Sequence, residues 1–467
     1  MTDPLRFAIV GHTNAGKTSL LRTLTRQVDF GEVSDRPGTT RHAEAIDLRL
    51  DGRVAVRFID TPGLEDSIAL LEYLNTLPEG TRIERVRAFL RGPEARASFE
   101  QEAKVLRALT GEADAAMLVI DTREPVLPKF RAEVEILTWC AKPIMPVLNF
   151  VQGAASRQGD WHQMLLEAGL HARVEFDVVA PFNGAERQLY ADMATLLPAR
   201  RAELAGIAQA LALEARERRL AACRAVAAGL IDVAAMRRAL PAEDFADEPK
   251  QKKFVRDFQD DVRRHARRAV DDLLAVFAFR PGDAELADIP QLAGRWEDDL
   301  FNPELLKDAG KRLGLGAVIG AGIGVVADVA LAGLSLGAAT TLGATIGGAA
   351  SGGWRPLWRK LENRLNGVQE LTVEAPVLLL LADHLLALAR ALAQRGHAAQ
   401  ERLQVRGAAA GEGGLDDGLR DLVRGLGPAR GHPEWERGKG AGASDADRQE
   451  LESALARRLD ERFEPAP

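Results

Sequence analysis

The first 198 residues alternate short apolar runs with segments of helical spacing. Consecutive apolar residues predict buried parallel strands at Leu5–Val10, Ala115–Asp121, Pro143–Phe150 and Val174–Val179. Helical spacing predicts helices between them at Phe130–Trp139 and Trp161–Ala168. Strands that alternate with helices favour a mostly parallel sheet with both faces covered. We therefore predict an α/β domain over residues 1–198.

A hairpin and an insertion interrupt this alternation. The alternating runs Ala45–Leu50 and Val54–Ile59 flank Asp51-Gly52, which predicts a β-hairpin. Residues 64–110 are long for a link to the next strand, and they contain two pieces with helical spacing. We predict an insertion here, either a solvated helical excursion or a surface for a partner or regulator.

From Ala199 the pattern changes to long helices, which defines a mainly α-helical domain over residues 199–400. The predicted helices are Glu203–Ala239, Lys253–Phe279 and Glu374–Arg395, with an acidic linker at Pro241–Pro249. Gly, Ala and charged residues dominate Gly407–Ala443. Residues 401–467 are therefore expected to form a flexible linker and one short terminal helix.

The segment Leu313–Trp354 differs from the rest of the helical region. Its only formal charge is Asp328, and its glycines recur four residues apart, as in closely packed membrane helices. Basic residues flank both ends, which suits a hairpin that enters a membrane and returns to the cytoplasmic face. With a turn near Gly333, each arm has about 20 residues, enough to cross a bilayer. The alternative is a hairpin packed inside a soluble domain, and the composition leaves both open.

Composition narrows the class of partner and the compartment. The net charge of −7 argues against a nucleic-acid-binding surface, so nucleic acid is not an expected partner. The only cysteines, Cys140 and Cys223, fit no disulfide or metal framework, which favours a reducing cytoplasm. The N-terminus carries no apolar signal segment. We expect a cytoplasmic protein, associated with the inner membrane if residues 313–354 contact lipid.

The stretch Gly11-His12-Thr13-Asn14-Ala15-Gly16-Lys17-Thr18 carries the most specific chemical signal. It lies between a predicted strand and a helix predicted at Ser19–Thr25, which is the context of a phosphate-binding loop. Its glycines let successive N–H groups turn toward an anion, and the helix start adds a positive dipole end. Lys17 can bridge the outer phosphates, and the Thr18 hydroxyl can bind Mg²⁺. The predicted nucleotide-binding residues of this loop are Gly11, His12, Thr13, Asn14, Ala15, Gly16, Lys17, Thr18 and Ser19.

A second motif, Asp60-Thr61-Pro62-Gly63, follows the predicted hairpin. Its aspartate, at the end of a strand, can hold Mg²⁺ through water, and the Gly63 N–H can reach a terminal phosphate. Between the two motifs lies Gly38-Thr39-Thr40-Arg41. A threonine in such a loop can complete the Mg²⁺ shell when a γ-phosphate is present.

These three motifs resemble those of the Era/TrmE-like branch of the translation-factor-related GTPases, over roughly the first 200 residues. The resemblance implies a P-loop G domain that binds GTP and GDP with Mg²⁺ and switches between two nucleotide states. It favours Thr40 over Thr39, and it makes Asn14 a candidate for holding K⁺, as the loop asparagine does in some members. The implied metal ligands are Thr18, Thr40 and Asp60, and the implied catalytic residues are Lys17, Thr40 and Gly63.

The residue after Gly63 bears on the expected rate, and the base-reading motif departs from the pattern of that family. Leu64 follows Gly63 where Ras-type enzymes carry an amide that positions water. We therefore expect slow GTP hydrolysis in the absence of K⁺ or a partner. The base-reading motif Asn-Lys-x-Asp is replaced by Asn149-Phe150-Val151-Gln152.

This altered motif still predicts a nucleotide base site, formed by Asn149, Phe150 and Gln152. Phe150 can cover one face of a purine ring. Gln152 carries both a donor and acceptors, so it reads guanine less sharply than a carboxylate, and ATP stays an alternative. A later base-contacting loop of the family would fall near Ala180-Pro181.

The whole layout also resembles a bacterial family of poorly characterised GTPases in which a G domain precedes a helical region of unknown function. The first hypothesis is a switch enzyme that hydrolyses GTP and relays its state through residues 64–110 to the helical half and an unidentified protein partner. The second is a nucleotide-binding scaffold or membrane-docking module with negligible turnover. The third, an RNA-associated assembly factor, follows from the analogy with Era alone, and the acidic charge opposes it.

Overall fold

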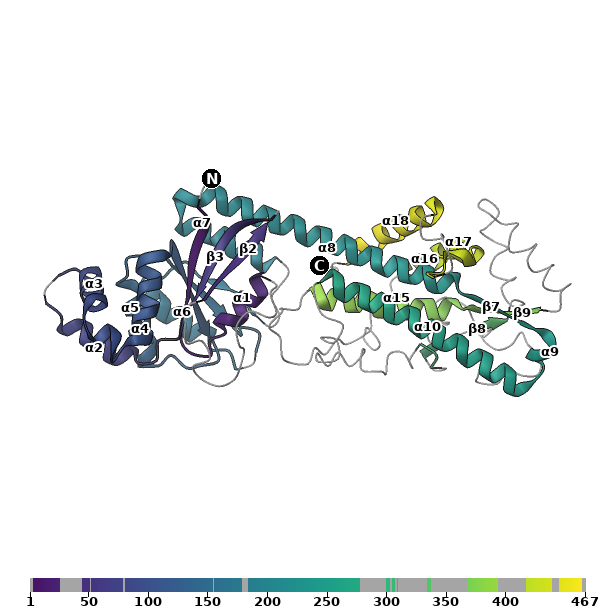
Figure 1. Cartoon of the computed structure of the whole chain (residues 1–467), viewed down its shortest axis with the longest axis horizontal. Coiled ribbons are helices and arrows are strands. Elements are labelled where there is room, and N and C mark those ends of the chain that lie inside the picture. The colour runs from purple at the N-terminus through teal and green to yellow at the C-terminus, as the bar shows by residue number, and fades with distance from the viewer. Residues whose placement is uncertain are drawn as a thin grey trace. The chain divides into compact units, whose positions relative to one another are not determined.

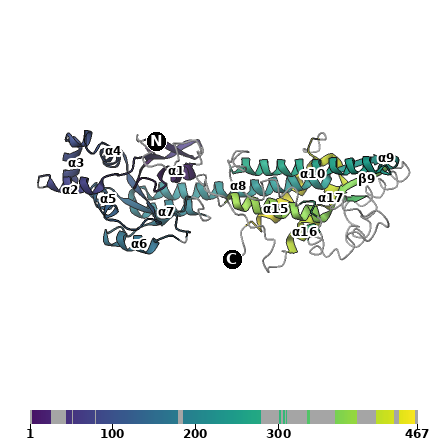
Figure 2. The same cartoon turned by 90° about the horizontal axis from the view of Figure 1, so that it is seen from below.

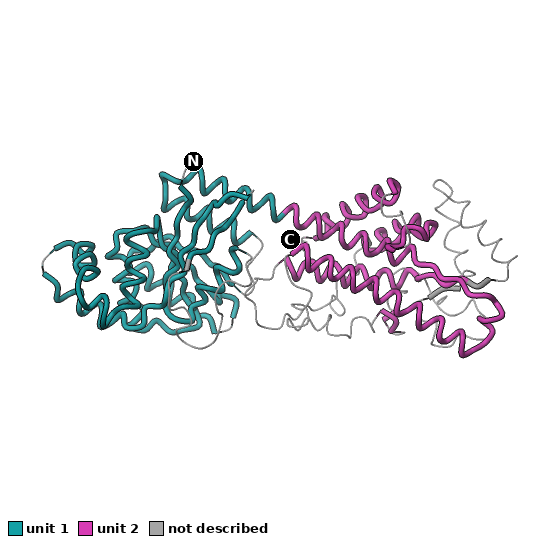
Figure 3. The backbone as a smooth tube through the Cα atoms, in the orientation of Figure 1, with its two compact units in different colours: residues 1–215, 394–400 teal, residues 216–393, 401–467 magenta. Residues whose placement is uncertain are grey.

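The chain divides into two compact units (Figure 3). Unit 1 comprises residues 1–215 and 394–400, and unit 2 comprises residues 216–393 and 401–467. The sequence predicts a domain boundary at 198, whereas the units meet inside helix α8 (Arg201–Ala235). The computed structural model describes residues 3–25, 44–50, 52–78, 80–153, 155–178, 184–277, 300–302, 305–306, 309, 334–336, 368–393, 417–438 and 445–463.

Unit 1 is built on a six-stranded sheet with the order β2-β3-β1-β4-β5-β6. Figure 1 labels its strands β2 and β3. The strands are β1 (Leu5–Val10), β2 (Glu44–Leu50), β3 (Arg53–Asp60), β4 (Ala115–Asp121), β5 (Ile144–Asn149) and β6 (Val174–Glu175). β2 pairs antiparallel with β3, and all the other pairs are parallel. The predicted α/β class is confirmed, although the last strand is shorter than the apolar run that predicted it.

Helices cover both faces of this sheet, as the alternating pattern predicts. They are α1 (Lys17–Thr25), α2 (Ser67–Thr76), α3 (Arg82–Arg91), α4 (Glu100–Arg107), α5 (Pro128–Thr138), α6 (Gln158–Glu167), α7 (Ala185–Leu196) and the first part of α8. One apolar cluster joins α1, α7 and α8 to the sheet, and a second joins α2 to α6 to the opposite face. Because β1, β3, β4 and β5 pair in parallel, their carboxyl ends lie at one edge of the sheet.

The insertion at residues 64–110 buries its apolar side chains in the cluster that covers one face of the sheet. Leu70, Leu74, Phe89 and Leu106 are fully or almost fully buried in the cluster that also holds Ala8 of β1. The insertion includes α3, which the sequence pattern missed, and this helix begins with a capping box. There Glu84 Oε2 accepts hydrogen bonds from the backbone N–H and hydroxyl of Thr81, each at 2.8 Å. The insertion thus buries its apolar side and leaves many polar residues exposed, and both the solvated excursion and the partner surface stay predictions.

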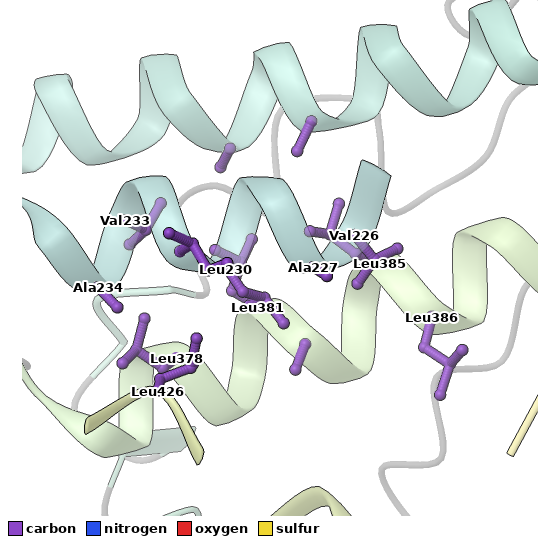
Figure 4. Packing of buried hydrophobic residues seen from close by; sticks show 14 of the residues in the cluster. Val226, Ala227, Leu230, Val233, Ala234, Leu378, Leu381, Leu385, Leu386 and Leu426 are labelled. Atoms are coloured by element: carbon purple, nitrogen blue, oxygen red, sulfur yellow. The ribbon is translucent and has the colours of Figure 1, made fainter. Parts of the chain in front are cut away.

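Three long helices form the centre of unit 2, namely α8, α10 (Glu248–Val276) and α15 (Ala375–Ala393), which lie side by side in both views (Figures 1 and 2). Figure 4 shows Leu230 of α8 beside Leu381 of α15 in their shared apolar cluster. At Gly229 a Cβ would lie 2.6 Å from the Cβ of Ala269, so the absence of a side chain lets α8 approach α10 closely. The other α-helices and strands in the described part of unit 2 are β7 (Arg237–Pro241), α9 (Ala242–Phe245), β8 (Leu334–Leu336), β9 (Val368–Val373), α16 (Asp417–Gly425), α17 (Gly427–Gly431) and α18 (Ala446–Asp460).

Unit 2 differs from the sequence prediction at three places. The helix predicted to reach Ala239 ends at Ala235, because Arg237–Pro241 pairs as β7 with β9. The predicted acidic linker at 241–249 contains α9 and the start of α10. The predicted linker at 407–443 contains α16 and α17, where Leu422 and Leu426 are fully buried in the core. Because small and charged residues surround these leucines in the sequence, the short amphipathic pattern was not recognised.

Two observations bear on the predicted membrane hairpin. Of the segment Leu313–Trp354 only Leu334–Leu336 is described, and it forms β8, paired antiparallel with β9. That strand replaces the start of the returning helical arm in the predicted hairpin, and the rest of the segment lies outside the described residues. Among the described helices, α15 alone is long and apolar enough to cross a membrane. Most of its apolar side chains are buried in the unit 2 core.

Candidate functional site

The loop after β1 has the backbone of an anion cradle. Positive φ angles occur at Gly11 (136°), Asn14 (66°) and Gly16 (94°), and α1 begins immediately afterwards at Lys17. A Cβ at Gly11 would lie 2.3 Å from the carbonyl oxygen of Val119, and one at Gly16 would lie 2.4 Å from Nδ2 of Asn149. Both glycines are therefore required by backbone conformation and by space. Such turns orient N–H groups toward one point, next to the positive end of the helix.

Lys17 is the buried cation of this loop. Its side chain is 7% exposed, and Nζ donates to the carbonyl oxygens of Gly11 at 2.8 Å and His12 at 2.9 Å. Burial lowers the pKa of Lys17, and the negative charges of Asp60 and Glu133 oppose that shift. An ammonium group held only by backbone carbonyls can transfer to phosphate oxygens without breaking an ion pair.

Thr18 and Asp60 form the oxygen pair expected of a Mg²⁺ site. The Thr18 hydroxyl donates to Asp60 Oδ2 at 2.8 Å, and Asp60 is 2% exposed at the end of β3. The next residue, Thr61, donates to the carbonyl oxygen of Ile9 at 2.6 Å, which fixes the end of β3 against β1. A hydroxyl and one carboxylate fit Mg²⁺, which takes few protein oxygens and completes its shell with phosphate and water. The third predicted ligand, Thr40, lies outside the described residues.

The segment after β3 rests directly on the phosphate-binding loop. A Cβ at Gly63 would lie 2.5 Å from the hydroxyl oxygen of Thr13 and 2.6 Å from its backbone nitrogen, so only glycine fits. His12 Nδ1 is 3.1 Å from the carbonyl oxygen of Leu64, whose side chain is fully buried. The two motifs, which are separate in sequence, thus form one continuous surface.

Asn149 connects three segments at the other end of this loop. It is fully buried, and its Nδ2 donates to the carbonyl oxygen of Ala15 at 3.0 Å. Its Oδ1 accepts from the backbone N–H groups of Phe150 at 2.9 Å and Val178 at 3.0 Å. Asn149 therefore ties the end of β5 to the phosphate-binding loop and to the segment after β6. The base site stays a prediction, and the loop expected near Ala180-Pro181 lies outside the described residues.

Phe150 occupies the position where the family pattern has lysine, and it has an unusual backbone. Its φ is 57°, and the guanidinium carbon of Arg123 lies 3.7 Å from the centre of its ring. Asp121 anchors this arginine through an ion pair at 2.7 Å. Gln152 is exposed in the turn that follows. The structure thus places a stacked cation and aromatic ring near Gly16, and it leaves Gln152 on the surface.

The sequence pattern missed a group of polar residues on the other side of the loop. Glu133 of α5 is 3% exposed, and Lys129 Nζ lies 2.9 Å from His12 Nε2. Both line a cavity of about 240 Å³ together with loop residues His12 to Ala15. The available signal was a carboxylate on the apolar face of a predicted helix, between Phe130 and Leu137. A cavity of about 300 Å³ at the amino end of β5 lies far from these groups in the sheet.

Two family models match the chain. Residues 6–150 match the family described as 50S ribosome-binding GTPase, and residues 162–457 match the one described as Domain of unknown function (DUF3482). GTPase Der of Azorhizobium caulinodans is 31% identical over 195 residues, which cover 42% of this chain and 36% of that protein. The tRNA modification GTPase MnmE of Granulibacter bethesdensis is 32% identical over 140 residues, which cover 30% of this chain and 31% of that protein.

The match therefore spans about a third of the length of these two relatives. Among solved structures, Era in complex with MgGDPNP and nucleotides 1506–1542 of 16S ribosomal RNA is similar to 38% of this chain. The aligned part covers 52% of that chain with 18% identity and a TM-score of 0.28, values that carry no functional weight.

Proposed function

The chain belongs to the family described as Domain of unknown function (DUF3482) and carries an N-terminal P-loop GTPase domain, and from this premise we propose that it hydrolyses GTP to GDP with Mg²⁺. One observation carries the proposal. The loop that begins at Gly11 places the buried Lys17 beside the Thr18–Asp60 pair, at the start of a helix. This arrangement supports the binding of a terminal phosphate and a hard divalent cation.

Each group has a distinct task in the proposed reaction. The N–H groups of the loop and the ammonium of Lys17 hold and orient the phosphate oxygens. Thr18, Asp60 and Thr40 would hold Mg²⁺, which neutralises charge on the phosphates when bound. The Gly63 N–H contacts the terminal phosphate, and its support against Thr13 fixes its position.

The proposed rate is slow unless K⁺ or a partner assists. Leu64 is fully buried, so its side chain neither reaches the reacting phosphate nor offers an amide to water. Asn14, exposed at the turn of the loop, is the proposed K⁺ contact. Hydrolysis that is equally fast in Na⁺ and K⁺, with no partner added, would contradict this part.

The proposed switch runs from the phosphate-binding loop into the insertion. His12 contacts the Leu64 carbonyl, and Glu102 of α4 accepts from the N–H groups of Glu65 at 3.2 Å and Asp66 at 3.0 Å. A change at Gly63 would therefore move groups held by α4. We propose that this movement is relayed to unit 2 and to a protein partner not yet identified.

Two measurements test the enzymatic core of the proposal. Purified protein with Mg²⁺, K⁺ and lipid should release phosphate from GTP above a Lys17→Ala control. Release no greater than the control would favour the second candidate, a nucleotide-binding scaffold with negligible turnover, which the buried Leu64 supports. Equilibrium binding should show a lower Kd for GTP than for ATP. Equal values would overturn guanine selectivity and leave a purine-nucleotide site intact.

Membrane contact is a separate part of the proposal. Its support is the composition of residues 313–354, which carry one formal charge and basic flanks. We propose a cytoplasmic protein that docks reversibly on the inner membrane through this segment. Flotation with liposomes of anionic lipid should recover the protein with GTP or with GDP bound. Protein that stays at the bottom of the gradient with both nucleotides would exclude this contact.

A further inference from the structure

A carboxylate lies buried beneath the phosphate-binding loop with no role in the scheme above. Glu133 of α5 is 3% exposed, and its Oε1 has no hydrogen-bond partner among the described residues. A buried carboxylate without partners is costly, because neither water nor a donor replaces its hydration. Such a group persists where its charge is used or where its proton is exchanged.

Charged groups from several elements face Glu133. The charges of Lys17, at the start of α1, and of Lys129, on the same helix as Glu133, both act on its carboxyl. Asp121 at the end of β4 and Glu124 after it line the same cavity. Burial and the charge of Lys129 lower the pKa of His12, which also lines it. Lys17 and Lys129 are therefore the cations whose charges act on Glu133.

Because burial and the charges of the two lysines act in opposite directions, the Glu133 carboxyl titrates near neutral pH. Burial raises the pKa of its carboxyl to about 7, and the charges of Lys17 and Lys129 act in the opposite direction. If Lys17 turns toward a phosphate, Glu133 loses part of that support. The phosphates also bring negative charge to the loop above it, and both changes favour the protonated carboxyl.

We propose that Glu133 is a positioning residue for nucleotide binding, whose buried carboxylate stabilises the Lys17 ammonium through its charge in the nucleotide-free protein and takes up one proton when phosphates draw Lys17 away. The inference rests on the proposed function, because it needs a nucleotide at the loop. The proton comes from solvent through the cavity of about 240 Å³, and it returns there when the nucleotide leaves. No bond other than O–H forms or breaks.

The consequence is a nucleotide affinity that depends on pH in a defined direction. Because the bound state holds more protons than the free state, Kd rises as pH rises through about 7. If binding shifts the pKa of Glu133 by one unit, Kd differs by up to about tenfold between the low-pH and the high-pH end of the titration.

The test compares three proteins across about pH 6.5 to 8.5, a range that spans the titration of a carboxyl with a pKa near 7. Glu133→Gln keeps the shape of the side chain and removes the titrating charge. Glu135→Gln removes an exposed carboxylate from the same helix and is the matched control. We expect the Kd for GDP to rise steeply with pH in wild type and in Glu135→Gln. In Glu133→Gln the rise of Kd over this pH range should be smaller by about three- to tenfold. The nucleotide's own titration contributes equally to all three, and parallel curves would overturn the inference.

A second measurement does not depend on the folding of a variant. Calorimetric titration of wild type with GDP at pH 7, in two buffers of different ionisation enthalpy, should report net proton uptake. Glu133→Asp, which restores the charge, should recover uptake that Glu133→Gln loses. Wild type that binds GDP without proton uptake would overturn this inference alone, whereas wild type that binds no nucleotide would overturn the proposed function.

Discussion

The phosphate-binding loop of unit 1 and the ionic network of unit 2 bury charge in different ways. In unit 1, the Lys17 ammonium is hydrogen-bonded to two backbone carbonyls, and the Glu133 carboxylate nearby lacks a partner at Oε1 among the described residues. In unit 2, Asp232 of α8 and Arg448 of α18 form an ion pair at 2.7 Å, and both are less than a tenth exposed. The first arrangement leaves charges available, and the second neutralises them.

The network of unit 2 extends well beyond this pair. Arg238 of β7 donates to both carboxylate oxygens of Glu436, at 2.8 and 2.7 Å, and also to Asp261 of α10 at 2.8 Å. Asp232 Oδ1 accepts further from the backbone N–H of Arg437 at 3.2 Å. These contacts fasten the C-terminal segment, which the sequence predicts as a linker, to the long helices of unit 2.

The difference separates charge used for function from charge used for structure. Closed ion pairs between distant segments specify how the segments meet, and removing one member exposes the other to an apolar interior. Partly satisfied charges at a loop of positive φ angles are costly for folding, and they suit a site that exchanges ligands. The comparison therefore predicts that substitutions in the two regions affect different properties.

The largest effect is expected from Arg448→Ala. It leaves Asp232 buried without its cation, which should lower the free energy of unfolding by about 3–5 kcal/mol. Urea unfolding followed by far-UV circular dichroism measures the loss. Arg457→Ala removes an exposed arginine from the same helix and should change stability by less than about 0.5 kcal/mol. If the two variants unfold alike, the network does not stabilise unit 2.

A smaller effect of a different kind is expected from Lys17→Ala. Removing the ammonium should weaken GTP binding or turnover by about a hundredfold, the loss typical of one preorganised donor to an oxyanion. The unfolding transition of unit 2 should not move. Arg91→Ala, which removes an exposed cation from α3, should bind GTP as wild type does. Fluorescence titration gives the affinities, and a Lys17→Ala protein with unchanged affinity and rate would remove the loop from the mechanism.

The smallest effect concerns one thiol in each unit. Burial raises the pKa of Cys140 in unit 1 and of Cys223 in unit 2 to about 12. Since the thiolate is the reactive form, both should react with iodoacetamide at least about tenfold more slowly in the native protein than in urea. Peptide mass spectrometry resolves the two sites. Arg448→Ala should accelerate labelling of Cys223 and leave Cys140 unchanged, and equal acceleration of both would contradict separate roles for the two regions.

The sequence predicted best where a short contiguous pattern was enough. The strands Leu5–Val10 and Ala115–Asp121 were predicted at the bounds that the structure has, because parallel strands of a covered sheet are continuously apolar. The base site was predicted less completely. The base-site role of Asn149 stays a prediction, and the stacking of Arg123 on Phe150 joins residues that are distant in sequence and has no local signature.

The sequence alone determined the phosphate-binding loop, because its positive φ angles need glycine at Gly11 and Gly16 and its chemistry needs Lys17 and Thr18 within one turn. Only the tertiary structure decided what surrounds that loop. Glu133 becomes a buried charge because α5 packs its apolar face against the strands beside the loop. The C-terminal segment becomes part of unit 2 because Arg448 meets Asp232 across 216 residues, a contact that no local period encodes.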